Sequence, residues 1–247
     1  MSTWSSVDVM GVRLAVLRKA GLLAQAITWC QDGERRTISY ANAHCLNVAW
    51  ENPRYRDVLN RSDLVYSDGV GVVWAARWLA GIGLEKITAR DWVEDLCVQA
   101  SARGLTLYLL GSRPGVAPQA VKALSRLYPG LRILAARDGF FEGMAEADVL
   151  DEIARLHPQI VLVGMGVPRQ DLWLAENRER IAAPLCWSVG ALFDLVAGIE
   201  QPVPAWMNAL ALEWFWRFLF DPLGKWRRYL LGTPLFLLRV AKKKLIR

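Results

Sequence analysis

The sequence predicts an open, doubly wound α/β sheet, and three observations carry that prediction. Short β-rich runs alternate with longer helical patterns, which is typical of repeated βα units. Most of the β-rich runs are continuously apolar, as strands buried on both faces of a parallel sheet require. Three of them end in glycine-rich loops. A chain of 247 residues can bury one large core, so we expect one main domain.

The predicted elements begin with an apolar segment, Val7 to Leu14, that fits a hairpin around Gly11. Six strands follow, each separated from the next by a predicted helix or a connecting loop. They span Thr37 to Ala41, Leu64 to Tyr66, Leu105 to Leu110, Leu131 to Ala135, Ile160 to Val163 and Leu185 to Val189. This order of elements predicts a Rossmann-like fold with a mostly parallel sheet flanked by helices.

Several helices have readable ends. One is expected to begin at Thr88 or Asp91 and to run to Ala102, just before Gly104. Another is expected to begin within residues 114–118, because prolines suit a first turn, and to end near Tyr128. In a later loop, Pro168 is predicted to be the first helical residue.

Beyond Gly198 the pattern changes to a helical, aromatic and basic appendage. Prolines and one glycine are expected to divide it into three pieces, at Pro202, Pro204, Pro222, Gly232 and Pro234. Residues 217–247 hold nine Lys or Arg and a single acid, a charge of +8, whereas the whole chain carries +6. We therefore predict a catalytic domain over residues 1–200 and a membrane-associating appendage over residues 201–247 that rests on an anionic surface.

The sequence predicts neither a membrane span nor a disulfide framework. No window reaches the roughly 18 to 20 uncharged apolar residues that a spanning helix needs. Four scattered cysteines, in a chain without a recognisable signal segment, fit a reducing cytosol. We expect each cysteine to act as a small buried hydrophobic residue.

Glycine pairs follow three predicted strands, at Asp68-Gly69-Val70-Gly71, Gly111-Ser112-Arg113-Pro114-Gly115 and Gly164-Met165-Gly166. Ligands of such sheets bind at the carboxyl ends of strands, where backbone N–H groups at helix starts suit a diphosphate. Gly69, Gly111, Gly164 and Gly166 are thus candidate substrate-binding positions, although turns that need positive φ explain them equally well. Neither the dinucleotide-binding fingerprint nor a P-loop is present.

Polar side chains also follow the strands. Asp68 stands between a strand and a helix, where its carboxylate suits a general base or, alternatively, a helix N-cap. Asn42 follows another strand, and its amide suits sugar hydroxyls or, again, an N-cap. Arg169 and Gln170 offer a guanidinium and an amide that can grip a phosphate or a base. With two histidines in the chain and no Asp-x-Asp pair at a strand end, we expect no metal site and no cofactor.

These motifs, taken in order, resemble the WecG/TagA/CpsF glycosyltransferases, glycosyltransferase family 26, over about residues 7–229. The ordered set carries the resemblance: Asn42 with its helix, Ser67-Asp68-Gly69-Val70-Gly71, Leu109-Leu110-Gly111, Asp138-Gly139-Phe140-Phe141, Val163-Gly164-Met165-Gly166-Val167-Pro168-Arg169-Gln170-Asp171, Val189-Gly190-Ala191-Leu192-Phe193-Asp194 and Leu212-Glu213-Trp214 through Arg228-Tyr229.

The resemblance implies an inverting transfer of a sugar from a UDP-sugar to a polyprenyl-diphosphate-linked acceptor at the cytoplasmic face of the plasma membrane, without an essential metal. It implies that Asp68 is the base and that Asn42 and Gln170 lie in the active site. The C-terminal arginines Arg217, Arg227 and Arg228 are implied to bind the diphosphate or lipid.

The chain departs from the family pattern at Tyr40, a further candidate substrate-binding residue, where the family has threonine. It departs also at Ala89, where the family has glycine, and at Pro202-Val203-Pro204, where the family has Arg-Ala-Pro. These departures leave the donor sugar open among glucose, N-acetylmannosamine and its uronic acid.

Two rival functions remain at the level of sequence. One is a non-catalytic nucleotide-binding module tethered to a membrane. The other is a nucleic-acid binder that uses the basic aromatic tail. The greasy helical spacing of that tail favours lipid, so no nucleic-acid partner is expected.

Overall fold

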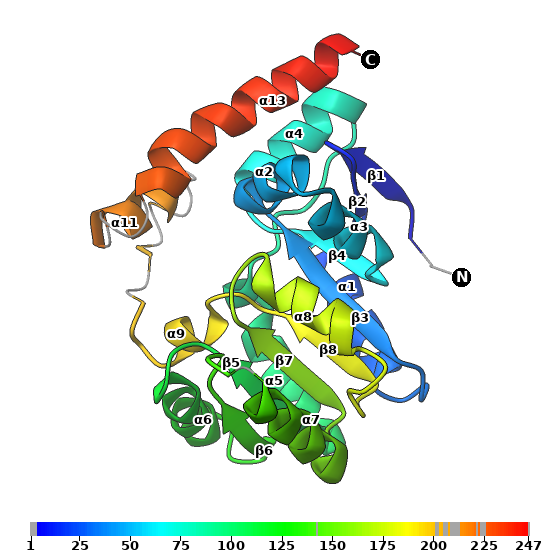
Figure 1. Cartoon of the computed structure of the whole chain (residues 1–247), viewed down its shortest axis with the longest axis vertical. Coiled ribbons are helices and arrows are strands. Elements are labelled where there is room, and N and C mark those ends of the chain that lie inside the picture. Colours follow the sequence, from blue (N-terminus) through cyan, green and yellow to red (C-terminus); the bar gives the residue numbers. More distant parts are fainter. Residues whose placement is uncertain are drawn as a thin grey trace.

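The computed structural model describes residues 4–141, 143–200, 203–204, 207, 213–220, 222 and 226–246. Six strands form one sheet in the order β4-β3-β8-β7-β5-β6, and every neighbouring pair is parallel (Figure 1). The strands are β3 (Arg36–Ala41), β4 (Leu64–Ser67), β5 (Thr106–Gly111), β6 (Arg132–Arg137), β7 (Ile160–Gly164) and β8 (Leu185–Ser188). All six predicted strands are confirmed, with ends that shift by one or two residues.

The predicted hairpin is also confirmed. Strands β1 (Ser6–Val9) and β2 (Val12–Ala15) pair antiparallel, with Gly11 in the turn at a φ of +88°. Glycine occupies this position without the steric cost that a side chain would add. The hairpin packs beside the sheet edge that β4 forms.

Helices cover both faces of the sheet. They are α1 (Lys19–Trp29), α2 (Ala43–Glu51), α3 (Pro53–Arg61), α4 (Val70–Ala80), α5 (Ala89–Arg103), α6 (Val116–Leu127), α7 (Met144–Leu156), α8 (Arg169–Asn177) and α9 (Leu192–Val196). Helix α5 begins with a capping box of Thr88 and Asp91 and ends at Gly104 in the left-handed conformation, as its sequence predicts. Pro168 is the N-cap of α8 rather than its first helical residue, so that prediction was wrong by one position.

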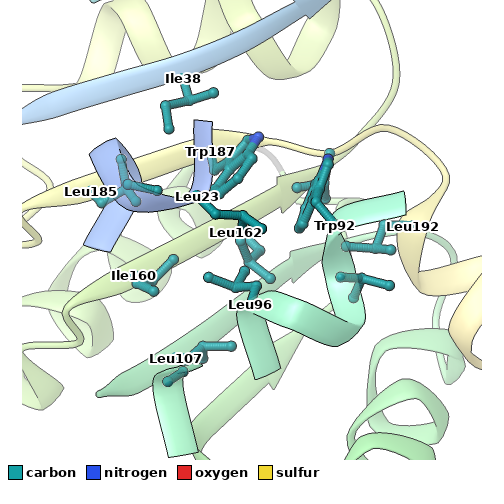
Figure 2. Packing of buried hydrophobic residues seen from close by; sticks show 14 of the residues in the cluster. Leu23, Ile38, Trp92, Leu96, Leu107, Ile160, Leu162, Leu185, Trp187 and Leu192 are labelled. Carbon is teal, nitrogen blue, oxygen red and sulfur yellow. The ribbon is translucent and has the colours of Figure 1, made fainter. Parts of the chain in front are cut away.

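The alternation of side chains along each strand divides the core between the two faces. On β5, Leu107 and Leu109 join the cluster under α1 and α5, whereas Tyr108 and Leu110 join the cluster under α7 and α8. Figure 2 shows the first cluster, in which Trp92 of α5 stacks on Trp187 of β8 with ring centroids 4.1 Å apart. The four cysteines are buried and free, as expected.

The described part of the appendage is helical. It holds α11 (Glu213–Phe220), a short π-helical turn η1 (Arg227–Leu231) and α13 (Gly232–Ile246). The prediction that Gly232 and Pro234 divide the appendage was right at Gly232, where η1 ends and α13 begins, and wrong at Pro234, which lies inside α13. Pro234 lies in the first turn of α13, where its missing N–H costs least. Pro202, by contrast, lies outside the described residues.

Helix α13 packs against α2 and α4. Its side chains Phe236 and Val240 are 1% and 0% exposed, and they belong to the same cluster as the hairpin, α2 and α4. Arg239 donates to the backbone oxygen and to Oδ1 of Asn47 on α2, each at 3.0 Å. Among the described residues, no helix is both long and apolar enough to cross a membrane.

Candidate active site

Two adjoining pockets lie at the carboxyl ends of the strands, where the fold class predicts a ligand site. The first, here named the Asp68 pocket, is lined by side chains from the ends of β3 and β4, the starts of α5 and α9, and residues 200 and 203. The second, named the glycine pocket, lies over the ends of β5, β6, β7 and β8. Ala191 lines both, so they meet at the loop after β8.

Asp68 lies in the loop between β4 and α4, held at the mouth of its pocket. The backbone N–H of Asp68 donates to the Ala41 carbonyl at 2.9 Å, which ties the loop to the end of β3. The N-cap of α4 is Gly69, with a φ of +95° and no side-chain cap. The Asp68 carboxylate is therefore not the N-cap that its position suggested as an alternative.

Asn42 fulfils the structural role that its sequence suggested and also contacts the candidate base. Its Oδ1 accepts the Cys45 N–H at 3.0 Å, which caps α2, while its Nδ2 donates to Asp68 Oδ2 at 3.1 Å. Because the cap uses only Oδ1 of Asn42, its Nδ2 is available to orient the Asp68 carboxylate.

Tyr40 lines the Asp68 pocket from β3. Its hydroxyl lies against the loop after β8, because a Cβ added to Gly190 would come within 2.5 Å of the Tyr40 oxygen. Gly190, at a φ of +58°, therefore leaves room for the Tyr40 hydroxyl where a side chain would not. Tyr40, Asn42 and Asp68 are the predicted residues that the fold brings together here.

Sequence reasoning missed other residues of the Asp68 pocket. Thr88 and Arg90 enter it from the start of α5, and Glu200 enters it from the end of the catalytic domain. The readable N-terminus of α5 was the available signal, and the Ile87 N–H, which donates to the Ser67 carbonyl at 2.9 Å, brings that helix start to the end of β4. Helices α2, α4 and α5 all begin at this edge of the sheet, and their N-termini favour negative ligand charge.

The glycine pocket lies at the topological switch point of the sheet. From neighbouring strands β5 and β7, the chain leaves in opposite directions, toward β6 and toward β8. Such divergence opens a crevice in which doubly wound sheets bind ligands. Gly164, Gly166 and Arg169 line it, as predicted, together with the unpredicted Ser112 and Asp194.

Close backbone approach explains two of the predicted glycines. A Cβ on Gly111 would lie 2.3 Å from the Gly164 oxygen, and a Cβ on Gly164 would lie 2.6 Å from the Gly190 oxygen. The ends of β5, β7 and β8 thus pack without room for side chains. Gly69 and Gly111 do not line either of these two pockets.

Polar side chains gather at the glycine pocket. Ser112, at a φ of +61°, donates from Oγ to Asp194 Oδ2, and Arg113 reaches Asp194 Oδ1 at 3.9 Å. A serine at positive φ is uncommon and occurs often at functional sites. Arg169 is held at the rim by its donation to the Phe141 carbonyl at 3.3 Å.

Gln170 lies below the pockets and lines neither of them. It is 0% exposed, and its Oε1 accepts the Gly190 N–H at 3.1 Å. Its neighbour Asp171 accepts hydrogen bonds from Ser39 Oγ at 3.0 Å, Ser188 Oγ at 2.7 Å and the Tyr55 hydroxyl. Burial raises the pKa of Asp171, although these hydroxyl donors act in the opposite direction. The pair joins α8 to β3, β8 and the loop that both pockets share.

Of the predicted C-terminal arginines, only Arg227 has a described side chain. It is exposed and lies over the Trp226 ring at 5.3 Å, and it lines neither pocket. The side chains of Arg217 and Arg228 lie outside the described part of the structure. The described residues contain no cluster of three or more His, Cys, Asp or Glu side chains that fits a metal ion.

Comparison with known proteins identifies the family of this chain. The model of the glycosyl transferase WecG/TagA/CpsF family matches residues 7–247. An N-acetylglucosaminyldiphosphoundecaprenol N-acetyl-beta-D-mannosaminyltransferase from Bacillus subtilis (strain 168) is 30% identical over 84% of this chain and 79% of its own. A protein of the same name from Staphylococcus aureus (strain NCTC 8325 / PS 47) is 26% identical over 98% of this chain and 95% of its own. This chain therefore belongs to the WecG/TagA/CpsF family of glycosyl transferases.

Proposed function

We propose that the protein transfers a sugar, with inversion, from a UDP-sugar to a sugar carried on a polyprenyl diphosphate, with Asp68 as the general base. The observation that carries the proposal is the Asp68 carboxylate, oriented by Asn42 at 3.1 Å in a pocket at the carboxyl edge of the sheet. Family membership supports the reaction class, and the name of the relatives describes transfer to a lipid-linked diphosphate sugar.

The two pockets suit the two reactants of a single displacement, the donor nucleotide and the acceptor hydroxyl. The donor nucleotide occupies the glycine pocket at the switch point, and its sugar reaches past Ala191 to Asp68. Asp68 takes the proton of the acceptor hydroxyl while the oxygen attacks the anomeric carbon and the bond to UDP breaks. One base and one leaving group in line produce inversion.

The leaving diphosphate needs positive charge, which the chain can supply without a metal. Arg169 at the rim of the glycine pocket is the described candidate, with the starts of α2, α4 and α5 adding partial positive charge, whereas Arg90 in the Asp68 pocket suits the diphosphate of the acceptor. Arg113 is partly engaged by Asp194. Metal independence is part of the proposal.

The protein is further proposed to work at the cytoplasmic face of the plasma membrane, as a peripheral protein on an anionic surface. The basic C-terminal segment and the lipid-linked acceptor in the relatives' name support this placement. The relatives' name makes an N-acetylmannosaminyl donor the first to test, ahead of its uronic acid and glucose.

The test is UDP release on incubation with a lipid-linked N-acetylglucosaminyl diphosphate and each of these UDP-sugars, with and without EDTA. We expect release with one donor, equal in both conditions. Activity that EDTA removes would overturn metal independence. UDP binding without release from any donor and acceptor would favour the rival, a non-catalytic nucleotide-binding module.

A further inference from the structure

Exposed apolar side chains gather at one end of the molecule. Among the described residues, most of the large exposed apolar side chains belong to α4 or to the C-terminal helices, and the exceptions are Val98, Leu127, Phe140, Met144 and Ile199. In Figure 1, α4 lies alongside α13 at the end of the molecule farthest from β6. A concentration of this kind marks an interaction surface.

Helix α4 contributes an apolar stripe from within the catalytic domain. Val70, Trp74 and Trp78 recur every four residues, so they share one face, and they are 47%, 43% and 40% exposed. The two indole rings stack at 5.0 Å. The opposite face of α4 is buried in the core cluster, so the stripe is not needed to hold the helix in place.

Helix α4, which carries the stripe, packs against the buried face of α13. The two helices meet where a Cβ on Gly71 would lie 3.5 Å from the Phe236 ring. Leu237 and Leu238, on the sides of α13 turned away from its buried face, are 44% and 67% exposed. Arg77 on α4 and Lys242 and Lys244 on α13 are exposed near this apolar surface.

We propose that the α4 stripe and the outer side of α13 form one membrane-docking face, which rests in the interfacial layer of an anionic bilayer. Tryptophan rings favour that layer, and the flanking basic residues complement its negative charge. The inference rests on the proposed function in one respect, since a lipid-linked acceptor gives a reason for docking.

Helix α4 fixes the geometry of docking relative to the site. It begins two residues after Asp68, and Trp78 lies eight residues beyond Val70, or about 12 Å along the helix axis. Amphipathic faces insert by about 5 to 10 Å, so docked tryptophans hold Asp68 close to the headgroup plane, where a lipid-linked diphosphate lies. The catalytic domain itself, and not the tail alone, thereby sets the depth of the site.

The test compares Trp74→Ser/Trp78→Ser with a control, Val98→Ser/Leu127→Ser, which removes exposed apolar side chains from α5 and α6. Cosedimentation with phosphatidylglycerol vesicles is measured after thermal unfolding shows that both variants are folded. We expect the tryptophan variant to bind about tenfold more weakly or worse, and the control to bind as the wild type does. Equal binding by all three proteins, or equal losses in both variants, would overturn the proposal.

Steady-state kinetics and the oligomeric state then show whether the α4 stripe contacts a bilayer, the acceptor lipid or a second subunit. With a short-chain acceptor and no vesicles, the tryptophan variant should retain wild-type turnover. A raised KM for a detergent-dispersed long-chain acceptor would instead make the stripe a substrate subsite, and a wild-type dimer that the variant dissociates would make it a subunit interface; either result overturns docking. Vesicle binding lost in the variant while no protein releases UDP would refute the proposed function alone.

Discussion

The two pockets differ in whether side chains or closely packed backbone shape them. The Asp68 pocket depends on side chains, among them Tyr40, Asn42, Arg90 and Glu200, whereas the glycine pocket depends on backbones that approach too closely for any Cβ. Substitutions in the first remove chemical groups and leave the strands in place. Substitutions of the crowded glycines Gly111 and Gly164 beside the second force the strand ends apart. Activity can therefore be lost at this sheet edge in two separable ways, by removal of a chemical group or by displacement of the strands.

The largest expected effect is on folding and comes from Gly111→Ala. Its Cβ would meet the Gly164 backbone at 2.3 Å, with a φ of +146° that disfavours a side chain. We expect a loss of at least about 4 kcal/mol of unfolding free energy, measured by denaturant titration. Gly166→Ala is the matched control, because its φ of +81° is strained but its surroundings are open, and it should cost about 1 to 2 kcal/mol. Similar losses in the two variants would refute the crowding argument.

Asp68→Asn should show the opposite pattern. Removing a general base is expected to lower turnover by about 10²- to 10⁴-fold, while the melting temperature and UDP affinity stay near wild type. The exposed Asp57→Asn on α3 serves as control. Near-normal turnover of Asp68→Asn would show that another group, such as Glu200 in the same pocket, removes the proton.

Two arginines test which pocket holds the donor diphosphate. Arg169→Ala should weaken UDP binding by about tenfold or more, because it removes a charged donor at the rim of the glycine pocket. Arg90→Ala should leave UDP binding nearly unchanged and raise the KM of the lipid-linked acceptor. Isothermal titration and steady-state kinetics distinguish the two, and a reversed pattern would exchange the proposed contents of the pockets.

Asn42 separates capping from catalysis. Asn42→Ala loses the cap of α2, at a cost of about 1 kcal/mol, and also the donor to Asp68. Asn42→Ser keeps a capping oxygen but loses the amide donor without adding a charge beside Asp68, so its melting temperature should stay near wild type while its turnover falls. If turnover falls only in Asn42→Ala, the amide acts on the helix and not on the base.

The smallest expected effect is on stability and comes from the pair of Arg137 and Glu152, at the outer edge of the sheet. Hydrogen bonding from Arg137 lowers the pKa of Glu152. The pair therefore contributes stability above the unfolded pKa of about 4.3, and this contribution is lost as the pH falls through the lowered value. Glu152→Gln should lower the melting temperature slightly at pH 7 and less at pH 3. An equal difference at both pH values would contradict this linkage.

The sequence predicted the strands well because each is a short apolar run between polar helices, and it placed Asp68 and Asn42 correctly because strand ends converge in a parallel sheet. It did not indicate that Gln170 would be buried, since a position beside a glycine loop does not say which way a side chain points. Arg90 and Glu200 were missed because their strand-end neighbours lie far away in the chain. Pro234 was misjudged because a proline ends a helix only when it lies beyond the first turn.

The burial of Phe236 and Val240 bears on how the chain folds during synthesis. These side chains belong to the same cluster as the hairpin residues Val7 to Leu14. The hairpin therefore cannot complete its packing before Phe236 and Val240 have been synthesised. Contacts of such long sequence separation form late and slowly. On the ribosome, the hairpin and the helices α2 and α4 must remain incompletely packed until α13 emerges. Synthesis of α13 is therefore the step that allows this part of the core to close.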